Sequence, residues 1–328
     1  MIITQTPLRI SFFGGGTDYP AHYKLHGGAA LSTSINKYTV ITVQRVPQFA
    51  DYCARVNYSR VESVNNIDEI QHPSARECLR FLGIKEGVEI HYVSDLPART
   101  GLGSSSSATV GLLMALHAFK GEVISRERVA AEAVYVEQEM IKERVGSQDQ
   151  YACALGGFMH LQFHQDLRVQ SDPVVLLPER LNALQARLLL MYTGIQRRAH
   201  EVLDEQLQRT QSGEITDDLH QLRQMVDQAL SVLAGNHNLS EFGALLHDSW
   251  LIKRRLSSKI SMPGIDDAYD RARLAGAIGG KLLGAGSGGF LLLFVEPQNR
   301  HAVLAAIPEL RVTDFALENS GSRVIFYR

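Results

Sequence analysis

The spacing of hydrophobic and polar positions predicts strands and two helices in the first half of the chain. Residues 39–46 (TVITVQRV) and 88–94 (VEIHYVS) are rich in β-branched residues, and residues 158–164 (FMHLQFH) alternate with a period of two. Such stretches are typical of half-buried strands. Apolar residues then recur at helical spacing after the serine run 104–107 and again over 125–140. The pattern therefore predicts two helices between the strands at 88–94 and 158–164.

Helical patterns dominate the second half. The expected elements are strands at 186–192, 289–295 and 323–327 and helices at 199–207, 219–233 and 239–256. Strands and helices do not alternate regularly, so the order favours an α+β fold over a doubly wound sheet. At about 150 residues per domain, the length of 328 residues predicts two domains, which we place at residues 1–180 and 181–328.

Composition and charge narrow the function classes. The chain has 33 Lys and Arg against 35 Asp and Glu, a net charge of −2, which gives no whole-surface attraction for nucleic acid or acidic membranes. No apolar run approaches the roughly 20 residues of a membrane span, and the first residues do not resemble a signal peptide. The 3 cysteines form no CxxC pair and no zinc-type spacing. We therefore expect a cytoplasmic protein that acts on small molecules.

The strongest candidate for chemistry is the segment LPARTGLGSSSS at residues 96–107. It follows a predicted strand and opens a predicted helix. Small residues let the backbone approach a ligand closely, and the first turn of a helix offers free N–H groups and the positive end of its dipole. These features predict a phosphate cradle, although the lysine of a Walker A loop is missing. A flexible serine linker is the alternative.

Two further glycine clusters flank this segment in sequence. Gly284, Gly286 and Gly289 satisfy G-x-G-x-x-G, but the apolar strand FLLLFV follows, whereas a dinucleotide fingerprint must open a helix. We therefore expect a tight hairpin that packs against a loop or a ligand, or a structural turn alone. The first cluster, PLRISFFGGGTD at residues 7–18, leads from a strand through glycines to Asp18. That carboxylate could bind sugar hydroxyls, or it could cap a turn.

Carboxylates downstream complete the set of candidates. Asp149 lies in the short loop GSQDQ after a predicted helix, where it could orient or deprotonate a substrate hydroxyl. Glu137 lies upstream and could serve a Mg²⁺ ion, which prefers one or two carboxylates together with phosphate oxygens and water. Glu139 competes with Glu137 for this role. Either carboxylate alone could equally be a solvated surface residue.

Together these segments resemble the GHMP kinases. PLRISFFGGGTD, LPARTGLGSSSSAT and KLLGAGSGGFLLLF are similar to the three motifs of that family and stand in the right order. The resemblance implies an N-terminal domain like ribosomal protein S5 domain 2, a ferredoxin-like C-terminal domain and an active site between them. Within the family, RISFFGGGTDYP, SQDQYACALGG and KRRLSSKIS are most similar to kinases of D-glycero-D-manno-heptose 7-phosphate.

The resemblance also implies residue roles. Asp149 and Arg9 would be catalytic, and ATP and Mg²⁺ would be the nucleotide and the metal. The implied ATP-binding residues are Gly101, Gly103, Ser104, Ser105, Ser106 and Ser107; the metal ligands are Ser105 and Glu137; the sugar-side residues are Gly16, Thr17 and Asp18. The reaction would transfer phosphate to the anomeric C1 hydroxyl of the heptose and yield the 1,7-bisphosphate for surface-glycan synthesis. A GHMP kinase of a free sugar such as fucose or galactose is the alternative.

A substrate that already carries a phosphate requires a second anion site. Arg197, Arg198, Lys253 and Arg254 are candidates, and Arg197 and Lys253 are the preferred ones. Guanidinium groups suit bidentate phosphate contacts, but such residues also cap helices or lie in solvent. The expected partner is a small sugar phosphate, and the sequence leaves a homodimer open.

Overall fold

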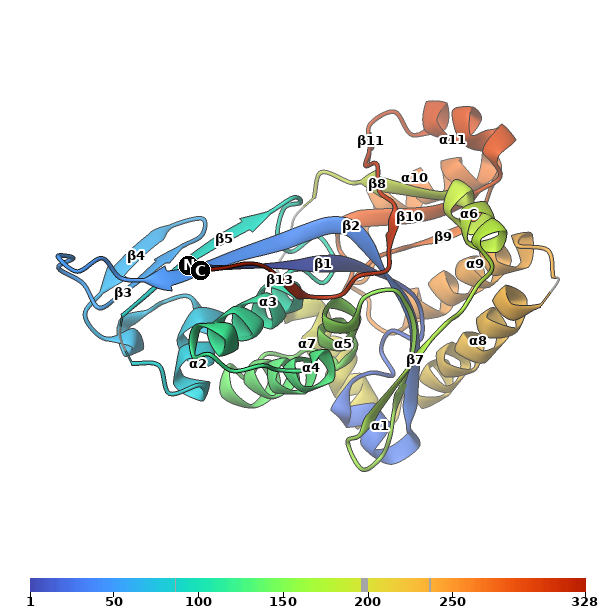
Figure 1. The fold of residues 1–328 in the computed structure, drawn as a ribbon. Helices are drawn as coiled ribbons and strands as arrows, with labels where there is room; N and C mark the ends of the chain where they lie inside the picture. Colours follow the sequence, from blue (N-terminus) through green and yellow to red (C-terminus); the bar gives the residue numbers. More distant parts are fainter. Residues whose placement is uncertain (86, 196–199, 236) are drawn as a thin grey trace.

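The computed structural model describes residues 1–85, 87–195, 200–235 and 237–328 and contains two β-sheets (Figure 1). Within these ranges, one sheet has nine strands and the other four. The first sheet contains β1 (Ile2–Phe13), β2 (Gly28–Arg45), β3 (Ala54–Asn57), β4 (Val61–Val64), β5 (Val88–Ser94), β6 (Phe158–Phe163), β7 (Val169–Pro173), β12 (Leu317–Glu318) and β13 (Arg323–Tyr327). The second contains β8 (Leu188–Tyr192), β9 (Ala277–Leu282), β10 (Phe290–Val295) and β11 (Arg311–Val312), all antiparallel neighbours.

Helices cover these sheets. They are α1 (Pro20–His26), α2 (Pro73–Phe81), α3 (Ser104–Phe119), α4 (Arg126–Tyr135), α5 (Gln148–Leu155), α6 (Pro178–Arg187), α7 (His200–Gln211), α8 (Thr216–Ala234), α9 (Ser240–Arg255), α10 (Pro263–Leu274) and α11 (Arg300–Ala306). Helices α3 and α5 pack on β1 and β2, while α9 packs on β9. Helix α8 contacts both α9 and the strands β1 and β2. The two sheets are therefore joined by helices as well as by the chain.

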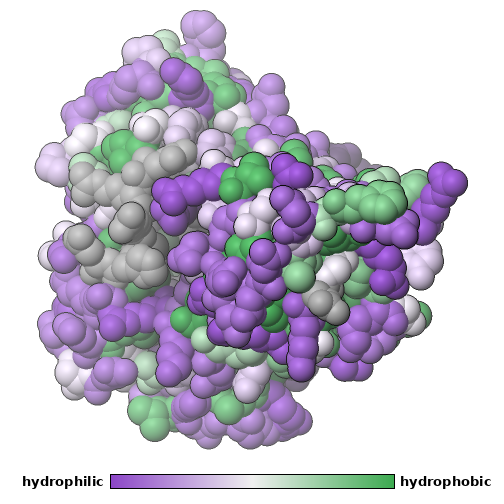
Figure 2. Space-filling view, turned by 90° about the vertical axis from the view of Figure 1, so that its left-hand side faces the viewer, coloured by the Kyte–Doolittle hydropathy of each residue, from purple (hydrophilic) through white to green (hydrophobic). Residues whose placement is uncertain are grey.

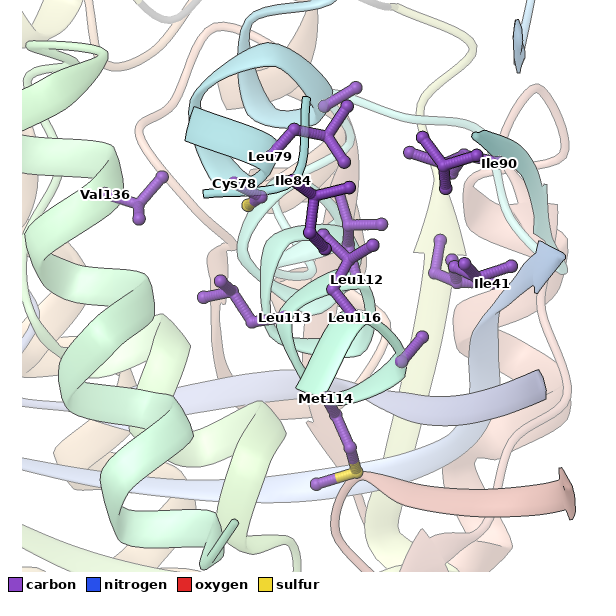
Figure 3. Packing of buried hydrophobic residues seen from close by; sticks show 14 of the residues in the cluster. Ile41, Cys78, Leu79, Ile84, Ile90, Leu112, Leu113, Met114, Leu116 and Val136 are labelled. Carbon is purple, nitrogen blue, oxygen red and sulfur yellow. The ribbon is translucent and has the colours of Figure 1, made fainter. Parts of the chain in front are cut away.

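The hydrophobic core beneath the first sheet depends on α3. Figure 3 shows Leu112 and Leu116 of α3 close to Ile84, with Ile41 of β2 and Ile90 of β5 facing them. All five side chains are buried. Burial of one such side chain contributes roughly 1.5–3 kcal/mol, so this contact area fixes α3 firmly against the sheet. Its first turn is thereby held in one orientation.

A second core joins the two sheets. Phe12 of β1 stacks on Phe158 of β6 at a centroid distance of 5.4 Å and meets Phe242 of α9 edge-on at the same distance. Phe13 also contacts Phe242, at 5.1 Å. The end of β1, where the glycine turn begins, is thus held between elements from both halves of the chain.

The face in Figure 2 is mainly hydrophilic, with hydrophobic residues scattered among polar ones.

Most predicted elements are present, with different lengths. The strands at 88–94 and 323–327 match β5 and β13. The strand predicted at 39–46 is only the second half of β2, because the first half (GAALSTSI) is buried on both faces and so shows no alternation. The helix predicted over 125–140 ends as α4 at Tyr135 and continues as a π-helical turn, Val136–Met140. Six of the described helices were not predicted: α1, α2, α5, α6, α10 and α11. The predicted loop at Asp149 is wrong, because that residue lies in the first turn of α5.

The division at residue 180 stays a prediction. Two segments that follow residue 180 nevertheless belong to the first sheet. Strands β12 and β13 lie beyond that point and pair with β2 and β1 of the first sheet. Within the described ranges, no helix is long and apolar enough to cross a bilayer.

Candidate active site

Asp149 and Arg9 form the centre of the candidate site. Asp149 lies in the first turn of α5, and Arg9 lies in β1. The Arg9 guanidinium donates two hydrogen bonds to the Asp149 carboxylate, from Nε to Oδ1 at 2.8 Å and from Nη2 to Oδ2 at 2.7 Å. The Arg9 side chain is 5% exposed, whereas that of Asp149 is 31% exposed. Asp149 is therefore held on one side by a buried cation and is open to a ligand on the other.

Arg9 also reaches the serine-rich loop. Its Nη1 donates to the carbonyl of Gly101 at 2.6 Å, and its backbone N–H donates to the carbonyl of Leu102 at 3.0 Å. Burial alone would lower the pKa of Arg9, but the charge of Asp149 and the hydrogen bonds to it raise the pKa overall. Arg9 thus stays charged and fixes the carboxylate relative to the loop.

The serine-rich loop changes direction at two glycines whose backbone is in the left-handed conformation. Gly101 and Gly103 have φ of 85° and 73°, and Gly103 caps α3, which begins at Ser104. A Cβ at Gly103 would lie 2.9 Å from Cγ of Arg9, so glycine is required for the close packing. The first N–H groups of α3 have no partner within the helix, as at any helix start, and their role as an anion cradle stays a prediction.

The four serines of this turn do not face the same way. Ser105 is exposed and Ser104 half-buried, whereas Ser106 and Ser107 are buried. Ser107 donates to the carbonyl of Thr6 at 3.1 Å, and Ser106 donates to Glu137 Oε2 at 2.9 Å. Only the first two are therefore open to a nucleotide through their side chains.

Glu137 is a buried carboxylate with one unpartnered oxygen. It lies in the π-helical turn after α4 and is 1% exposed, while Glu139 is exposed. Its Oε2 accepts from Ser106 and from Gln150 Nε2, but its Oε1 has no hydrogen-bond partner among the described residues. Burial raises the pKa of Glu137 to about 7. A hydroxyl and an unpartnered carboxylate oxygen fit Mg²⁺, which needs few protein ligands when phosphates supply the rest.

The structure pairs Glu137 with Ser106 rather than with Ser105, the predicted metal ligand. Adjacent residues on a helix point about 100° apart. Because α3 buries the Ser106 side toward Glu137, Ser105 points away from that contact. A metal role for Ser105 remains a prediction. Among the described residues, no group of three or more His, Cys, Asp or Glu could form a metal site without help from a ligand.

Asp18 follows the glycine turn of residues 14–17 and is almost completely buried. Its Oδ1 accepts from the Gly16 N–H at 2.9 Å and its Oδ2 from the Gln148 N–H at 3.4 Å. Burial, and next the charge of Asp149, raises the pKa of Asp18 to about 6. A Cβ at Gly146 would overlap with the Asp18 carboxylate. Asp18 and Asp149 therefore lie close enough for their charges to interact.

Gly16 and Thr17 shape this turn. The Thr17 hydroxyl contacts the carbonyls of Gly14 and Ala29 at 2.8 and 2.9 Å, and Thr17 is fully buried. Gly16 has φ of 105°. Both residues are enclosed by protein, and their predicted contact with substrate stays a prediction.

The comparisons with known proteins agree with this geometry. Residues 71–157 match the family model for the GHMP kinases N terminal domain, and residues 225–311 match that for GHMP kinases C terminal. The chain belongs to the GHMP kinases. It is accordingly an ATP-dependent kinase with the two-domain fold of that family.

Relatives cover nearly the whole of this GHMP kinase. It is 28% identical to a D-glycero-alpha-D-manno-heptose 7-phosphate kinase of Campylobacter jejuni, with 98% of this chain and 97% of that protein covered. A crystal structure of a D-glycero-D-manno-heptose 1-phosphate kinase from Bacteroides thetaiotaomicron matches with a TM-score of 0.80 at 23% identity and covers 100% of both chains. Lactococcus lactis galactokinase complexed with galactose matches with a TM-score of 0.74 at 19% identity, covering 98% and 94%.

The third motif of this GHMP kinase packs against the second. A Cβ at Gly284 would overlap with Gly101, and a Cβ at Gly289 would overlap with the Thr100 carbonyl. The N–H of Phe290 donates to that same carbonyl at 3.1 Å. Ser287 has φ of 62°, and its N–H donates to the Ile260 carbonyl at 2.8 Å. The hairpin thus packs directly on residues 100 and 101 at the start of the serine-rich loop.

Two of the cations predicted to bind a second phosphate, Lys253 and Arg254, have other partners. Lys253 Nζ donates to the carbonyls of Leu282 and Gly284 at 3.0 and 2.5 Å, and burial lowers its pKa to about 7, with the charge of Arg9 as the next cause. Arg254 pairs with Asp266 at 2.9 Å. Arg197 and Arg198 lie outside the described residues.

Sequence reasoning missed the residues on either side of Asp149. Gln148 Oε1 accepts from Ser11 at 3.2 Å on the Asp18 side, while Gln150 contacts Glu137 on the metal side. Both glutamines are buried. The sequence SQDQ shows polar residues on both sides of Asp149, but no local pattern in it marks the two glutamines as buried.

Proposed function

We propose that this sugar kinase transfers the γ-phosphate of ATP to the anomeric C1 hydroxyl of D-glycero-D-manno-heptose 7-phosphate and releases the 1,7-bisphosphate. Such a product would feed nucleotide-activated heptose for surface glycans. The observation that carries the transfer chemistry is the bidentate Arg9–Asp149 pair beside the α3 cradle. The similarity to the Campylobacter jejuni protein supports the sugar.

The residues divide the reaction as follows. The N–H groups at the start of α3 hold the triphosphate, and Asp18 orients the sugar hydroxyls. The C1 oxygen attacks the γ-phosphorus, the bond from that phosphorus to the bridging oxygen breaks, and ADP leaves. Asp149 accepts the proton of the hydroxyl. Arg9 holds Asp149 in place and stabilises negative charge.

Glu137 and a serine hydroxyl of the α3 turn would hold Mg²⁺. When bound, Mg²⁺ neutralises charge on the β- and γ-phosphates. The observation that supports this placement is that Oε1 of Glu137 is buried and has no hydrogen-bond partner among the described residues.

A free sugar is the second candidate. The contacts of Lys253 and Arg254 favour it, because Lys253 is hydrogen-bonded to backbone carbonyls and Arg254 is paired with Asp266, so neither is free to bind a substrate phosphate. A Bacteroides fragilis L-fucokinase/L-fucose-1-P guanylyltransferase is also 26% identical over 98% of this chain, although only 38% of that protein is covered.

The deciding experiment is ADP release with Mg-ATP across a sugar panel. The panel contains heptose 7-phosphate, heptose 1-phosphate, free heptose, mannose, fucose and galactose. Turnover of heptose 7-phosphate with a product phosphorylated at C1 would support the proposal. Turnover of a free sugar or of heptose 1-phosphate, and none of heptose 7-phosphate, would contradict it while keeping the kinase.

A further inference from the structure

A β-bulge interrupts β1 just before the glycine turn. In the ladder between β1 and β2, Ser11 pairs with Ser32 and Phe13 pairs with Leu31, so Phe12 has no partner residue. A bulge bends its strand and redirects the chain that follows. Here the chain that follows is the turn ending at Asp18. The bulge therefore sets the direction from which Asp18 enters the site.

Lys281 holds this bulge from the other sheet. It lies in β9, and its Nζ donates to the Phe12 carbonyl at 2.8 Å. Lys281 is 3% exposed, and burial, followed by the positive charges of Lys253 and Arg9, lowers its pKa well below the ordinary value. Burial of an ammonium group is costly unless the group is paired. An aliphatic side chain would suit the core better, so the lysine is explained by its bond to Phe12.

The same strand end engages the rest of the site. Leu282 and Gly284, which follow Lys281, accept hydrogen bonds from Lys253 of α9. Gly284 also packs on Gly101 of the serine-rich loop. The segment 281–284 thus contacts the sugar-side turn through Lys281 and the phosphate loop through Gly284.

We propose that Lys281 is a positioning residue for the phosphoryl-transfer site: by holding the bulged carbonyl of Phe12, it sets the path of residues 12–18 and so the placement of Asp18. This inference rests on the proposed function only in assigning Asp18 to the sugar. In this role Lys281, which is 3% exposed, makes no direct contact with the sugar. It acts through the backbone of motif one and ties that motif to the C-terminal sheet.

The first test requires no substrate. In Lys281→Met, hydrogen–deuterium exchange of the peptide covering residues 12–18 is expected to be about tenfold faster, since one buried hydrogen bond is lost. The peptide covering β13 should exchange as in the wild type. If Lys281→Met does not fold, Lys281→Gln replaces it with the same expectation, because its shorter side chain does not reach Phe12. Wild-type exchange over residues 12–18 would overturn the proposal.

The second test uses whichever panel sugar the wild type phosphorylates. The loss variant is expected to raise the KM for the sugar about tenfold, with nucleotide affinity within about twofold. Lys281→Arg, which keeps a charged donor, should recover most of this loss. Val303→Ala, in the core under α11, is the matched destabilising control and should leave both constants unchanged. An unchanged sugar KM, or Lys281→Arg as impaired as the loss variant, would overturn the proposal. Failure of heptose 7-phosphate as a substrate would contradict the proposed function alone.

Discussion

The two ends of the candidate site differ in how their charged side chains are used. At the transfer end, Arg9 and Asp149 bind each other through two hydrogen bonds, and Asp149 keeps an open face. At the far end, Arg254 binds Asp266, while Lys253 binds backbone carbonyls next to the serine-rich loop. The transfer end is therefore assembled in advance, as phosphoryl transfer requires. The described cations of the far end are bound to other protein groups and form no ready phosphate site. The structure therefore determines the choice of sugar less well than it determines the transfer chemistry.

The largest expected effect lies at the transfer end. Asp149→Asn removes the proton acceptor but keeps the shape, so kcat should fall by about 10²–10⁴. Nucleotide affinity, measured by titration with a non-hydrolysable ATP analogue, should change by less than about twofold. Arg254→Ala is the far-end counterpart and should leave kcat within about twofold, because it breaks only a partly exposed ion pair. Comparable losses in both variants would remove the distinction between the two ends.

Sequence predicted the transfer end better than the far end, for a physical reason. The three glycine-rich motifs are local: glycines mark the turns, and the serines mark a helix start, so their backbone paths follow from the residues themselves. Which of Ser105 and Ser106 points toward Glu137 depends instead on how α3 packs against that residue. The partners of Lys253 and Lys281 are carbonyls from distant segments, which no local pattern reveals. The pairing of β13 with β1 is hidden for the same reason.

The next largest effect tests the link between the two ends through Asp18. Gly146→Ala would push a methyl group against the Asp18 carboxylate. We expect the sugar KM to rise about tenfold or more, since overpacking costs typically 1–3 kcal/mol. Gly264→Ala in α10 is the matched control, because a Cβ there meets nothing within 4 Å. A wild-type sugar KM in Gly146→Ala, from initial rates at saturating Mg-ATP, would show that Asp18 does not bind the sugar.

A smaller effect separates the two serines at the start of α3. Ser105→Ala and Ser106→Ala are compared by titrating Mg²⁺ at fixed ATP and by measuring binding of the ATP analogue with and without Mg²⁺. Ser106→Ala removes a donor to Glu137 and should raise the Mg²⁺ requirement several-fold, about the effect of one charged hydrogen bond. If Ser105 ligates the metal, Ser105→Ala will have the larger effect. Equal, wild-type behaviour of both variants would contradict a metal site at this turn.

The smallest effect is a pH dependence that distinguishes buried Asp18 from the partly exposed Arg254–Asp266 pair of the far end. Burial, and next the charge of Asp149, raises the pKa of Asp18 to about 6. An unfolded Asp has a pKa of about 3.9, below that of Asp18 in the folded protein. Ionised Asp18 therefore lowers the free energy of unfolding above pH 6, and this loss of stability disappears as the pH falls toward about 4. Asp18→Asn carries no such penalty at any pH. The wild-type Tm minus the variant Tm should therefore rise by about 2 °C or more between pH 7 and pH 4.5. Stability is measured instead of activity because a sugar phosphate itself titrates near about pH 6. A Tm difference that is constant with pH would mean that Asp18 is solvated, and that the transfer end is no more enclosed than the far end.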